Sequence, residues 1–337
     1  MSRFLIVRLG SLGDVVHAIP FAAALRSGFP QARIDWITDP RYIGLLDMVT
    51  VLDRRIAFDP RAAWRGRRGS ALRTLGELRR AGYDAVFDLQ GLLKSAVIAR
   101  AAGAGRVVGF PRRHLREPLA RLFYSETPDP GSATHVIYRN LALLAPFGVA
   151  DRRVSFPLAI PPSETVDSVA GRFAPAGFAL INPGAAWPNK RWPAACFGAV
   201  AAALRHAHGL HSLVLWGPGE RELAHEVAAA SAGAAEVAPP TTVQELAGIA
   251  RASRLMISGD TGPMHVAAAV GTPLVTLFGP TRPERNGPWG LYDVALSRVD
   301  RCACVYERRC RRDVPCISDI GVDEVLEAVD RRLGSHG

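Results

Sequence analysis

Short apolar runs alternate with longer amphipathic segments along the whole chain. Runs typical of buried strands occur at 4–7, 34–37, 85–88 and 107–110 in the first half, and at 178–181, 213–216, 255–258 and 274–278 in the second. Apolar positions at helical spacing occur at 15–27, 194–208, 221–230, 243–252 and 322–333. Because strands that alternate with helices form parallel sheets with right-handed crossovers, the pattern predicts an α/β protein with two doubly wound domains.

A proline-rich segment separates the two halves. Pro157, Pro161 and Pro162 punctuate it, so we expect a first domain at 1–155, a linker at 156–165 and a second domain at 166–337. A chain of 337 residues is long enough for two domains of ordinary size. Doubly wound domains bind ligands at the carboxyl ends of their strands, and we expect these ends to face a central cleft.

Positive charge is concentrated in the first half. Residues 1–150 carry 22 Arg and Lys against 12 Asp and Glu, whereas residues 151–337 carry 19 of each sign. This asymmetry predicts that one domain meets an anionic partner, such as a phosphorylated substrate or a membrane surface. Nucleic acid is disfavoured as that partner, because the arginines are not interleaved with stacking aromatic side chains and no recognition motif is present.

Lysine is rare in this chain: Lys94 and Lys190 are the only two among 41 basic residues. Lysine supplies a compact point charge on a flexible stem, which a planar guanidinium does not replace. We therefore interpret both as site candidates, with a solvated surface position as the alternative. No apolar run approaches the length of a membrane span and no signal-peptide pattern is present, so the sequence predicts a cytoplasmic protein.

The first expected strand leads into a glycine-containing turn at 10–17. Gly10 and Gly13 permit a tight turn, and the helix that follows presents free backbone N–H groups. Asp14 is expected at the start of this helix, where a carboxylate stays ionised and can act as a general base; a helix N-cap is the alternative. The segment lacks the features of a P-loop and of a dinucleotide fingerprint, which disfavours a nicotinamide enzyme.

A second anion site is predicted at 259–265, directly after an expected strand. Thr261 suits a helix cap, Gly262 a close backbone approach and Pro263 the first helical position. The N-terminus of the helix would suit a diphosphate, because its backbone N–H groups and dipole favour anions.

Three further residues complete this expected site. Lys190 follows a strand of the same sheet and is the expected counter-charge to the diphosphate. Glu220 follows another strand, at the place where a carboxylate commonly binds ribose hydroxyls. His265 either contacts phosphate or is satisfied by a backbone carbonyl.

Five motifs occur in order, at 11–17, 88–96, 116–124, 190–193 and 260–265. They read Ser-Leu-Gly-Asp-Val-Val-His, Asp-Leu-Gln-Gly-Leu-Leu-Lys-Ser-Ala, Arg-Glu-Pro-Leu-Ala-Arg-Leu-Phe-Tyr, Lys-Arg-Trp-Pro and Asp-Thr-Gly-Pro-Met-His. With these motifs the chain resembles, over essentially its whole length, the lipopolysaccharide core heptosyltransferases of glycosyltransferase family 9. That family has the GT-B fold of two Rossmann-like domains, and the 116–120 segment is similar to the members that add the first heptose.

The resemblance implies an inverting, metal-independent and cofactor-free transfer of heptose from ADP-heptose to a Kdo sugar of the inner core. It implies that Asp14 is the base that deprotonates the acceptor hydroxyl. An anionic Kdo-lipid acceptor also implies peripheral association with the inner face of the cytoplasmic membrane. The implied donor-binding residues are Gly13, Lys190, Glu220, Asp260, Thr261, Gly262 and His265, and the implied acceptor-binding residues are Ser11, Arg61, Gln90, Lys94 and Arg116.

Alternatives to this interpretation remain open. Residues 185–189 depart from the first-heptose pattern, so another heptose acceptor or another nucleotide sugar is the runner-up within the family. A nucleotide-sugar epimerase or dehydrogenase would need the dinucleotide fingerprint that is absent. A non-catalytic sugar-nucleotide binding protein would keep Lys190 and Asp260 but would have no need for Asp14.

Four cysteines lie close together near the C-terminus, at 302, 304, 310 and 316. They can bind metal, form a disulfide or stay reduced, but they lack the paired C-x₂-C spacing of common zinc sites. A cytoplasmic compartment favours reduced thiols. Cys196, in an expected helix, is interpreted as a core residue.

Overall fold

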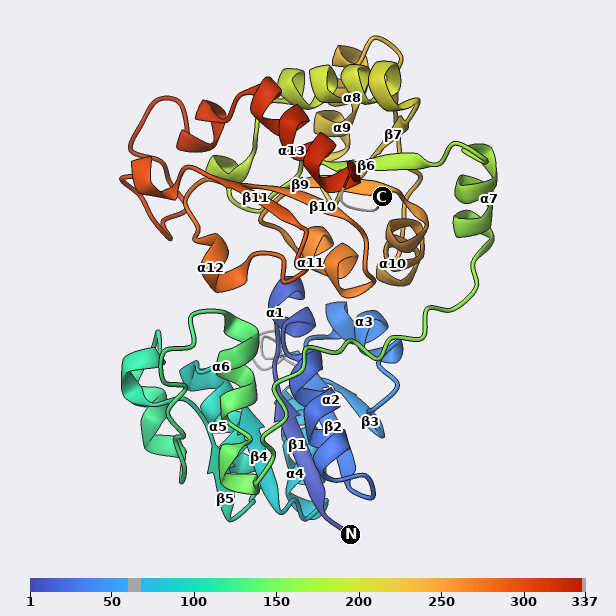
Figure 1. Ribbon diagram of the computed structural model, residues 1–337. Helices are drawn as coiled ribbons and strands as arrows, with labels where there is room; N and C mark the ends of the chain where they lie inside the picture. Colours follow the sequence, from blue (N-terminus) through green and yellow to red (C-terminus); the bar gives the residue numbers. More distant parts are fainter. Residues whose placement is uncertain (60–67, 335–337) are drawn as a thin grey trace. The chain divides into compact units, whose positions relative to one another are not determined.

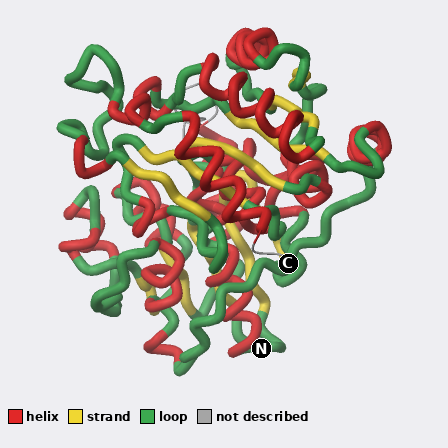
Figure 2. The backbone as a smooth tube through the Cα atoms, turned by 45° about the horizontal axis from the view of Figure 1, so that its top comes forward, coloured by secondary structure: helices red, strands yellow, loops and turns green. Residues whose placement is uncertain are grey.

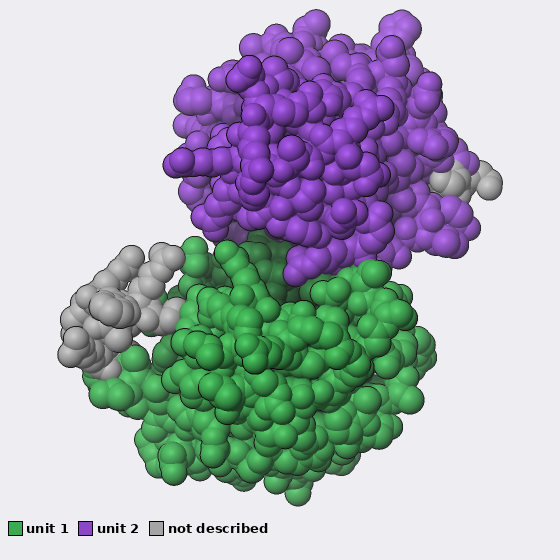
Figure 3. Space-filling model, turned by 90° about the vertical axis from the view of Figure 1, so that its left-hand side faces the viewer, with its two compact units in different colours: residues 1–159 green, residues 160–337 purple. Residues whose placement is uncertain are grey.

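The computed structural model describes residues 1–59 and 68–334, and the chain divides into two compact units, residues 1–159 and 160–337. The division lies inside the segment expected to be a linker, 156–165. Figure 3 colours the two units separately. Arg61, an expected acceptor-binding residue, lies outside the described residues.

The first unit is built on a five-stranded parallel sheet with the order β3-β2-β1-β4-β5. At the centre of this sheet Val7 pairs with Ile37 on one side and Asp88 on the other, so the carboxyl ends of three strands are level. Helices cover both faces (Figures 1 and 2). The strands are β1 Arg3–Val7, β2 Arg33–Thr38, β3 Arg54–Ala57, β4 Ala85–Asp88 and β5 Arg106–Val108, and the helices are α1 Leu12–Val16, α2 Ile19–Gly28, α3 Ile43–Asp47, α4 Arg68–Arg80, α5 Leu93–Ala101 and α6 Val136–Ala142.

Aromatic side chains fill one face of this sheet. The ring of Phe87 lies 5.0 Å from that of Phe21 and 5.0 Å from that of Phe147, and Phe4 contacts the same group edge-on. Such pairs add about 0.5–1.5 kcal/mol each beyond the area that they bury. They anchor the two central strands, β1 and β4, whose carboxyl ends carry the site.

The prediction of a single helix at 15–27 is wrong, because the chain forms two helices there. The first, α1, ends at Val16, and α2 begins at Ile19 with Pro20 at its second position. Proline has no N–H to donate to the carbonyl four residues earlier, and its ring clashes with that carbonyl, which in a continuous helix would be that of Val16. The break leaves α1 as a short separate helix that carries Asp14.

The second unit is a six-stranded parallel sheet with the order β11-β10-β9-β6-β7-β8. Its strands are β6 Phe178–Asn182, β7 His211–Val214, β8 Ala235–Val237, β9 Leu255–Gly259, β10 Leu274–Phe278 and β11 Val294–Ser297. Its helices are α7 Glu164–Arg172, α8 Ala194–His208, α9 Arg221–Ala230, α10 Val243–Ala252, α11 Gly262–Ala269, α12 Pro283–Asn286 and α13 Val322–Gly334.

The final helix, α13, packs against α8 on the face of this sheet that α9 also covers, while α10 and α11 cover the other face (Figure 1). The core under α8 and α13 includes Phe197, Val329 and Trp192, whose indole N–H donates to the carbonyl of Ile320 over 3.0 Å. Sequence alone did not place this helix, because an amphipathic stripe specifies that one face is buried and not against which element.

Three strands were not expected from the sequence: β3, β8 and β11. Each lies at an edge of its sheet and is short, and their sequences Arg-Arg-Ile-Ala, Ala-Glu-Val and Val-Ala-Leu-Ser lack a long apolar run. An edge strand gains hydrogen bonds from one neighbour only, so its formation depends on that neighbour more than on local pattern. The strand expected at 213–216 also forms two residues earlier, as β7.

The chain order reverses at the centre of each sheet, between β1 and β4 in the first unit and between β6 and β9 in the second. Open α/β sheets bind ligands beyond the carboxyl ends of the strands at such a switch point. The loops that follow these four strands carry most of the expected site residues.

Candidate active site

Asp14 is held at the carboxyl end of β1 by two neighbours. One carboxylate oxygen accepts hydrogen bonds from the backbone N–H (3.0 Å) and the hydroxyl (2.9 Å) of Ser11, which is the N-cap of α1. The other lies 2.5 Å from the guanidinium of Arg8. The Asp14 side chain is 37% exposed, so the carboxylate is oriented by the protein and still open to solvent. The N-cap alternative is therefore corrected: Ser11 caps α1, and Asp14, three residues on, reaches back to it.

Arg8 and Gln90 join this turn to the end of β4. The Arg8 guanidinium donates to the carbonyl of Leu89, and the Gln90 side-chain oxygen accepts from the backbone N–H of Leu9 at 2.7 Å. Gln90 thus lies with Ser11 and Asp14 at the switch point of the first sheet. Arg8 is a functional candidate that the sequence analysis missed, although a buried arginine between an apolar strand and a glycine is an unusual position.

The motif at 88–96 is organised by a fully buried carboxylate. Asp88 accepts from the backbone N–H of Gln90 (2.9 Å) and Gly91 (3.2 Å), and from the hydroxyls of Ser95 (2.9 Å) and Tyr124 (2.7 Å). Burial raises the pKa of Asp88 above its ordinary value, against the lowering effect of these donors. Asp88 therefore shapes the loop that carries Gln90.

Lys94 and Arg116 belong to two motifs that a single hydrogen bond joins. The Glu117 carboxylate accepts from the backbone N–H of Leu93, the first residue of α5, at 2.7 Å. The residues next to this bond, Lys94 and Arg116, are both exposed. A carboxylate at a helix N-terminus satisfies a free N–H and complements the helix dipole. The contact therefore places Lys94 and Arg116, two residues expected to bind the acceptor, on neighbouring segments.

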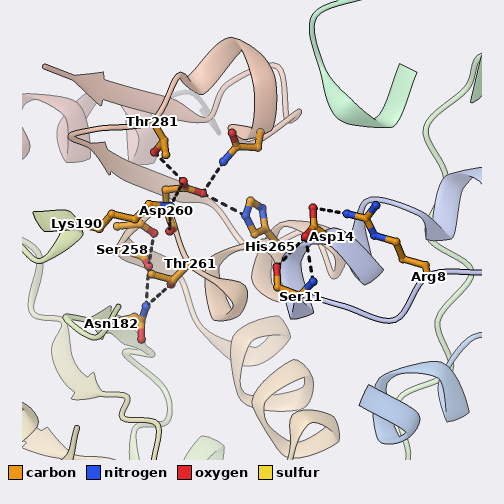
Figure 4. A network of polar contacts seen from close by, with 12 residues as sticks. Arg8, Ser11, Asp14, Asn182, Lys190, Ser258, Asp260, Thr261, His265 and Thr281 are labelled. Carbon is orange, nitrogen blue, oxygen red and sulfur yellow. Dashed lines mark hydrogen bonds and ion pairs between the residues drawn. The ribbon is translucent and has the colours of Figure 1, made fainter. Parts of the chain in front are cut away.

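In the second unit, the side chains of Lys190 and Asp260 form a nearly buried ion pair. The Lys190 ammonium lies 2.6 Å from a carboxylate oxygen of Asp260, and the two side chains are 15% and 4% exposed. Asp260 also accepts from Thr281 and Asn286, at 2.7 Å each, and lies 3.4 Å from the imidazole Nε2 of His265 (Figure 4). Burial pushes the pKa of Asp260 upward, but His265 and Lys190 outweigh it and hold the pKa far below the ordinary range.

This arrangement refines the expected roles. The Asp260 carboxylate is occupied by protein donors, so its evident role is to anchor Lys190. His265 faces the Asp260 carboxylate. Thr281 and Asn286, from the β10–α12 loop and α12, were missed because no local pattern links them to a residue more than twenty positions earlier.

The start of α11 is tied to the neighbouring strand β6. The Asn182 amide donates to the hydroxyls of Ser258 (2.9 Å) and Thr261 (2.8 Å). Thr261 is the N-cap by position, but its hydroxyl accepts from Asn182 and makes no cap bond; Gly262 is the first helical residue and Pro263 the second. The backbone N–H groups at the start of α11 therefore gain no partner from that hydroxyl, which suits an anion.

Glu220 lies over the carboxyl ends of β6 and β7. Its carboxylate accepts from the backbone N–H of Gly217 at 3.1 Å and lies 3.6 Å from the Arg191 guanidinium. A Cβ atom at Gly184 would lie 2.1 Å from a carboxylate oxygen of Glu220, so glycine is needed there to admit this side chain. The position suits a ribose contact at the same switch point as Lys190.

The profile of glycosyltransferase family 9 (heptosyltransferase) matches residues 71–313. The chain belongs to glycosyltransferase family 9. Lipopolysaccharide heptosyltransferase 1 of Pseudomonas aeruginosa is 31% identical over 322 residues, which cover 91% of this chain and 87% of that protein. The chain is therefore a glycosyltransferase.

Solved structures of family members have the same GT-B fold. A family 9 glycosyltransferase from Veillonella parvula superimposes with a TM-score of 0.81 at 24% identity, covering 99% of this chain and 97% of that one. The E. coli heptosyltransferase WaaC with ADP-2-deoxy-2-fluoro heptose gives 0.72 at 25% identity, covering 97% of this chain and 99% of that one. Among residues 1–59 and 68–334 of this family 9 chain, no helix has the length and apolar character needed to cross a bilayer.

Proposed function

We propose that this glycosyltransferase transfers heptose from ADP-heptose to a Kdo sugar of the lipopolysaccharide inner core, with inversion at the anomeric carbon and without a catalytic metal. The relatives named as lipopolysaccharide heptosyltransferase 1 support the sugar and the pathway. The observation that carries the proposal is the Lys190–Asp260 cluster beside the start of α11. It supplies a fixed cation and backbone N–H groups that the N-cap side chain does not bind, where a departing diphosphate would gather charge.

The donor would be held at the switch point of the second sheet. The ribose would bind Glu220, whose carboxylate lies over the ends of β6 and β7. The diphosphate would bind Lys190 and the N-terminus of α11 at Gly262. The E. coli relative with ADP-2-deoxy-2-fluoro heptose supports the choice of ADP as the nucleotide.

The acceptor would be held by the basic first unit. Kdo carries carboxylates and its lipid anchor carries phosphates, so exposed cations such as Lys94 and Arg116 are suited to it. The same surplus of positive charge would favour peripheral contact with an anionic membrane, at about 1 kcal/mol for each basic side chain near the surface.

Asp14 would act as the general base. Its carboxylate would take the proton from the acceptor hydroxyl while the oxygen attacks the anomeric carbon and the bond to the diphosphate breaks, with ADP as the leaving group. Arg8 and Ser11 orient this carboxylate: the Arg8 guanidinium lies 2.5 Å from one oxygen, and the Ser11 backbone N–H donates to the other. A single displacement inverts the configuration, and charge on ADP would be stabilised by Lys190 in the role that a metal has in other transferases.

The decisive experiment is a transfer assay with ADP-heptose and a Kdo-lipid acceptor, comparing the wild type, Asp14→Ala and Asp53→Ala. Asp53 is a matched control in the same unit: it lies 2.5 Å from Arg26 and is 44% exposed. We expect Asp14→Ala to lose about 10²–10⁴-fold in kcat with unchanged ADP binding, and Asp53→Ala to retain activity. Full activity in Asp14→Ala would exclude Asp14 as the base.

The same assay separates the alternatives. Transfer to a heptose-bearing acceptor but not to Kdo would place the enzyme later in core assembly. Selective binding of UDP or GDP in calorimetry would show that the donor carries that nucleotide instead of ADP. Loss of transfer on adding EDTA, restored by a divalent cation, would refute metal independence. Proton NMR of the product reports the anomeric configuration directly, and retention would refute a single displacement.

A further inference from the structure

Four thiols lie in contact within residues 302–316, between β11 and α13. The sulfur of Cys304 is 3.4 Å from that of Cys302 and 3.6 Å from that of Cys310, and Cys302 also contacts Cys316. None of them is in a disulfide, and none has a part in the donor or acceptor roles described above. Within residues 1–59 and 68–334, no group of three or more histidine, cysteine or acidic side chains is arranged to hold a metal ion. Sulfurs this close together can take part in thiol–disulfide exchange.

Cys304 and Cys310 are the pair best placed to form a disulfide. Five residues separate them, enough backbone to bring two sulfurs from 3.6 Å to the bonding distance of about 2.0 Å. A bridge between Cys302 and Cys304 would enclose a single residue, which leaves little freedom to reach disulfide geometry. Burial raises the pKa of both Cys302 and Cys316, which makes that pair a poor source of the attacking thiolate.

The surroundings of Cys310 favour a particular oxidant. Two arginines precede it and two follow it, at 308, 309, 311 and 312, and Cys310 is partly exposed. Two of these are paired, Arg311 with Glu307 at 2.7 Å and Arg312 with Asp319 at 2.8 Å, which leaves a net positive segment. A small anionic disulfide such as oxidised glutathione would be attracted to this thiol.

The cysteine segment also supports the loop that carries Lys190. The buried Asn189 amide donates to the carbonyl of Glu307 at 2.9 Å and lies 3.9 Å from the Cys304 sulfur. Glu307 in turn donates its backbone N–H to the carbonyl of Cys304 at 3.0 Å, so the two residues form one turn. Any movement of Cys304 is therefore transmitted through Glu307 to Asn189, the neighbour of Lys190.

Two further contacts join the same elements. The backbone N–H of Tyr306 donates to the carbonyl of Pro280, next to Thr281, at 2.8 Å. Two cations lie near the Trp187 ring. The Lys190 ammonium is 4.8 Å from the ring centroid and the Arg308 guanidinium is 5.8 Å from it. The segment thus touches both loops that position the Lys190–Asp260 pair.

We propose that Cys304 and Cys310 are a thiol–disulfide modification site whose oxidation weakens ADP binding at the adjoining Lys190 loop. The Cys310 thiolate attacks one sulfur of the small disulfide and releases one thiol, and the Cys304 thiolate then attacks Cys310 and releases the second. The protein loses two protons and two electrons, and the small disulfide is reduced to two thiols. The coupling to ADP rests on the proposed function, whereas the bridge itself does not.

The test equilibrates the purified full chain with graded ratios of reduced and oxidised glutathione, traps free thiols by alkylation and maps the bridges by peptide mass spectrometry. We expect a bridge between the peptides containing Cys304 and Cys310, formed in Cys196→Ser and Cys302→Ser and absent in Cys310→Ser. Calorimetry should show ADP binding about fivefold or more weaker in the oxidised than in the reduced protein. In Cys310→Ser, whose side chain is partly exposed, the two conditions should give equal ADP affinity.

The outcomes are separable. No bridge under strongly oxidising ratios, or a bridge that persists in Cys310→Ser, would overturn the site. A bridge with unchanged ADP affinity would overturn the coupling. The purified protein could instead contain one equivalent of zinc or iron, with the four thiols unreactive until a chelator is added. That result would refute the disulfide proposal and indicate a metal site. If neither redox form binds ADP while the bridge forms, the donor assignment fails and the modification site stands.

Discussion

Replacing Asp260 by asparagine is expected to destabilise the second unit by about 2–4 kcal/mol at neutral pH. The carboxylate is 4% exposed, lies 2.6 Å from the Lys190 ammonium and accepts hydrogen bonds from Thr281 and Asn286. Breaking a buried ion pair costs about 3–5 kcal/mol, and the partial exposure of Lys190 and the retained shape of the amide reduce that figure. The NH₂ group of the new asparagine would also face the donors that the carboxylate now accepts from, Thr281, Asn286 and Lys190.

The pH dependence gives this prediction its sharpest form. The pKa of Asp260 is lower in the folded protein than in the unfolded chain, so its stabilising contribution is complete above the unfolded value of about 4. The contribution is lost as pH falls towards the folded pKa. The difference in unfolding free energy between wild type and Asp260→Asn should therefore be constant above about pH 5 and shrink by about 1.4 kcal/mol per pH unit below 4.

Asp293→Asn is the matched control. Asp293 is 6% exposed and lies 3.0 Å from Arg332, but it accepts from the backbone N–H of Leu274, at the amino end of β10 and away from the donor site. Burial raises the pKa of Asp293, so its pH dependence has the opposite sign: the wild type gains stability relative to Asp293→Asn as pH falls through the folded pKa.

Urea unfolding monitored by tryptophan fluorescence measures both variants, since four of the six tryptophans lie in the second unit. Equal stability of wild type and Asp260→Asn at neutral pH would refute the anchoring role. A difference that stays unchanged between pH 5 and pH 3 would refute the depressed pKa.

Two further substitutions test the donor site. Lys190→Gln should weaken ADP binding about tenfold or more, equivalent to about 1.4 kcal/mol, while Lys94→Gln, in the other unit, should leave it unchanged; equal losses in titration calorimetry would contradict the assignment. Gly184→Ala should reproduce the ADP affinity of Glu220→Ala, because the new Cβ would occupy the place of the Glu220 carboxylate, 2.1 Å away. Wild-type affinity in Gly184→Ala, beside a loss in Glu220→Ala, would show that Glu220 binds from another position.

The sequence was sufficient for the fold class because central parallel strands are buried on both faces. The strands β1, β4, β6, β9 and β10 are continuous apolar runs that the local pattern reveals, and the expected helices α8, α9 and α10 have the observed bounds. The site motifs were also visible locally, because Asp14 and Lys190 stand in the segments that follow such strands, near glycines. These features depend on neighbours in sequence, so one chain segment determines each of them.

Tertiary structure decided the rest. The edge strands β3, β8 and β11 form because a neighbouring strand supplies their hydrogen bonds, and α13 docks where α8 leaves apolar surface. The motif around Asp260 does not predict its role, since Thr281, Asn286 and Lys190 converge on it from separate loops. A partner distant in sequence leaves no local trace in a single chain, and only folding brings the cation, the carboxylate and the two donors to one place.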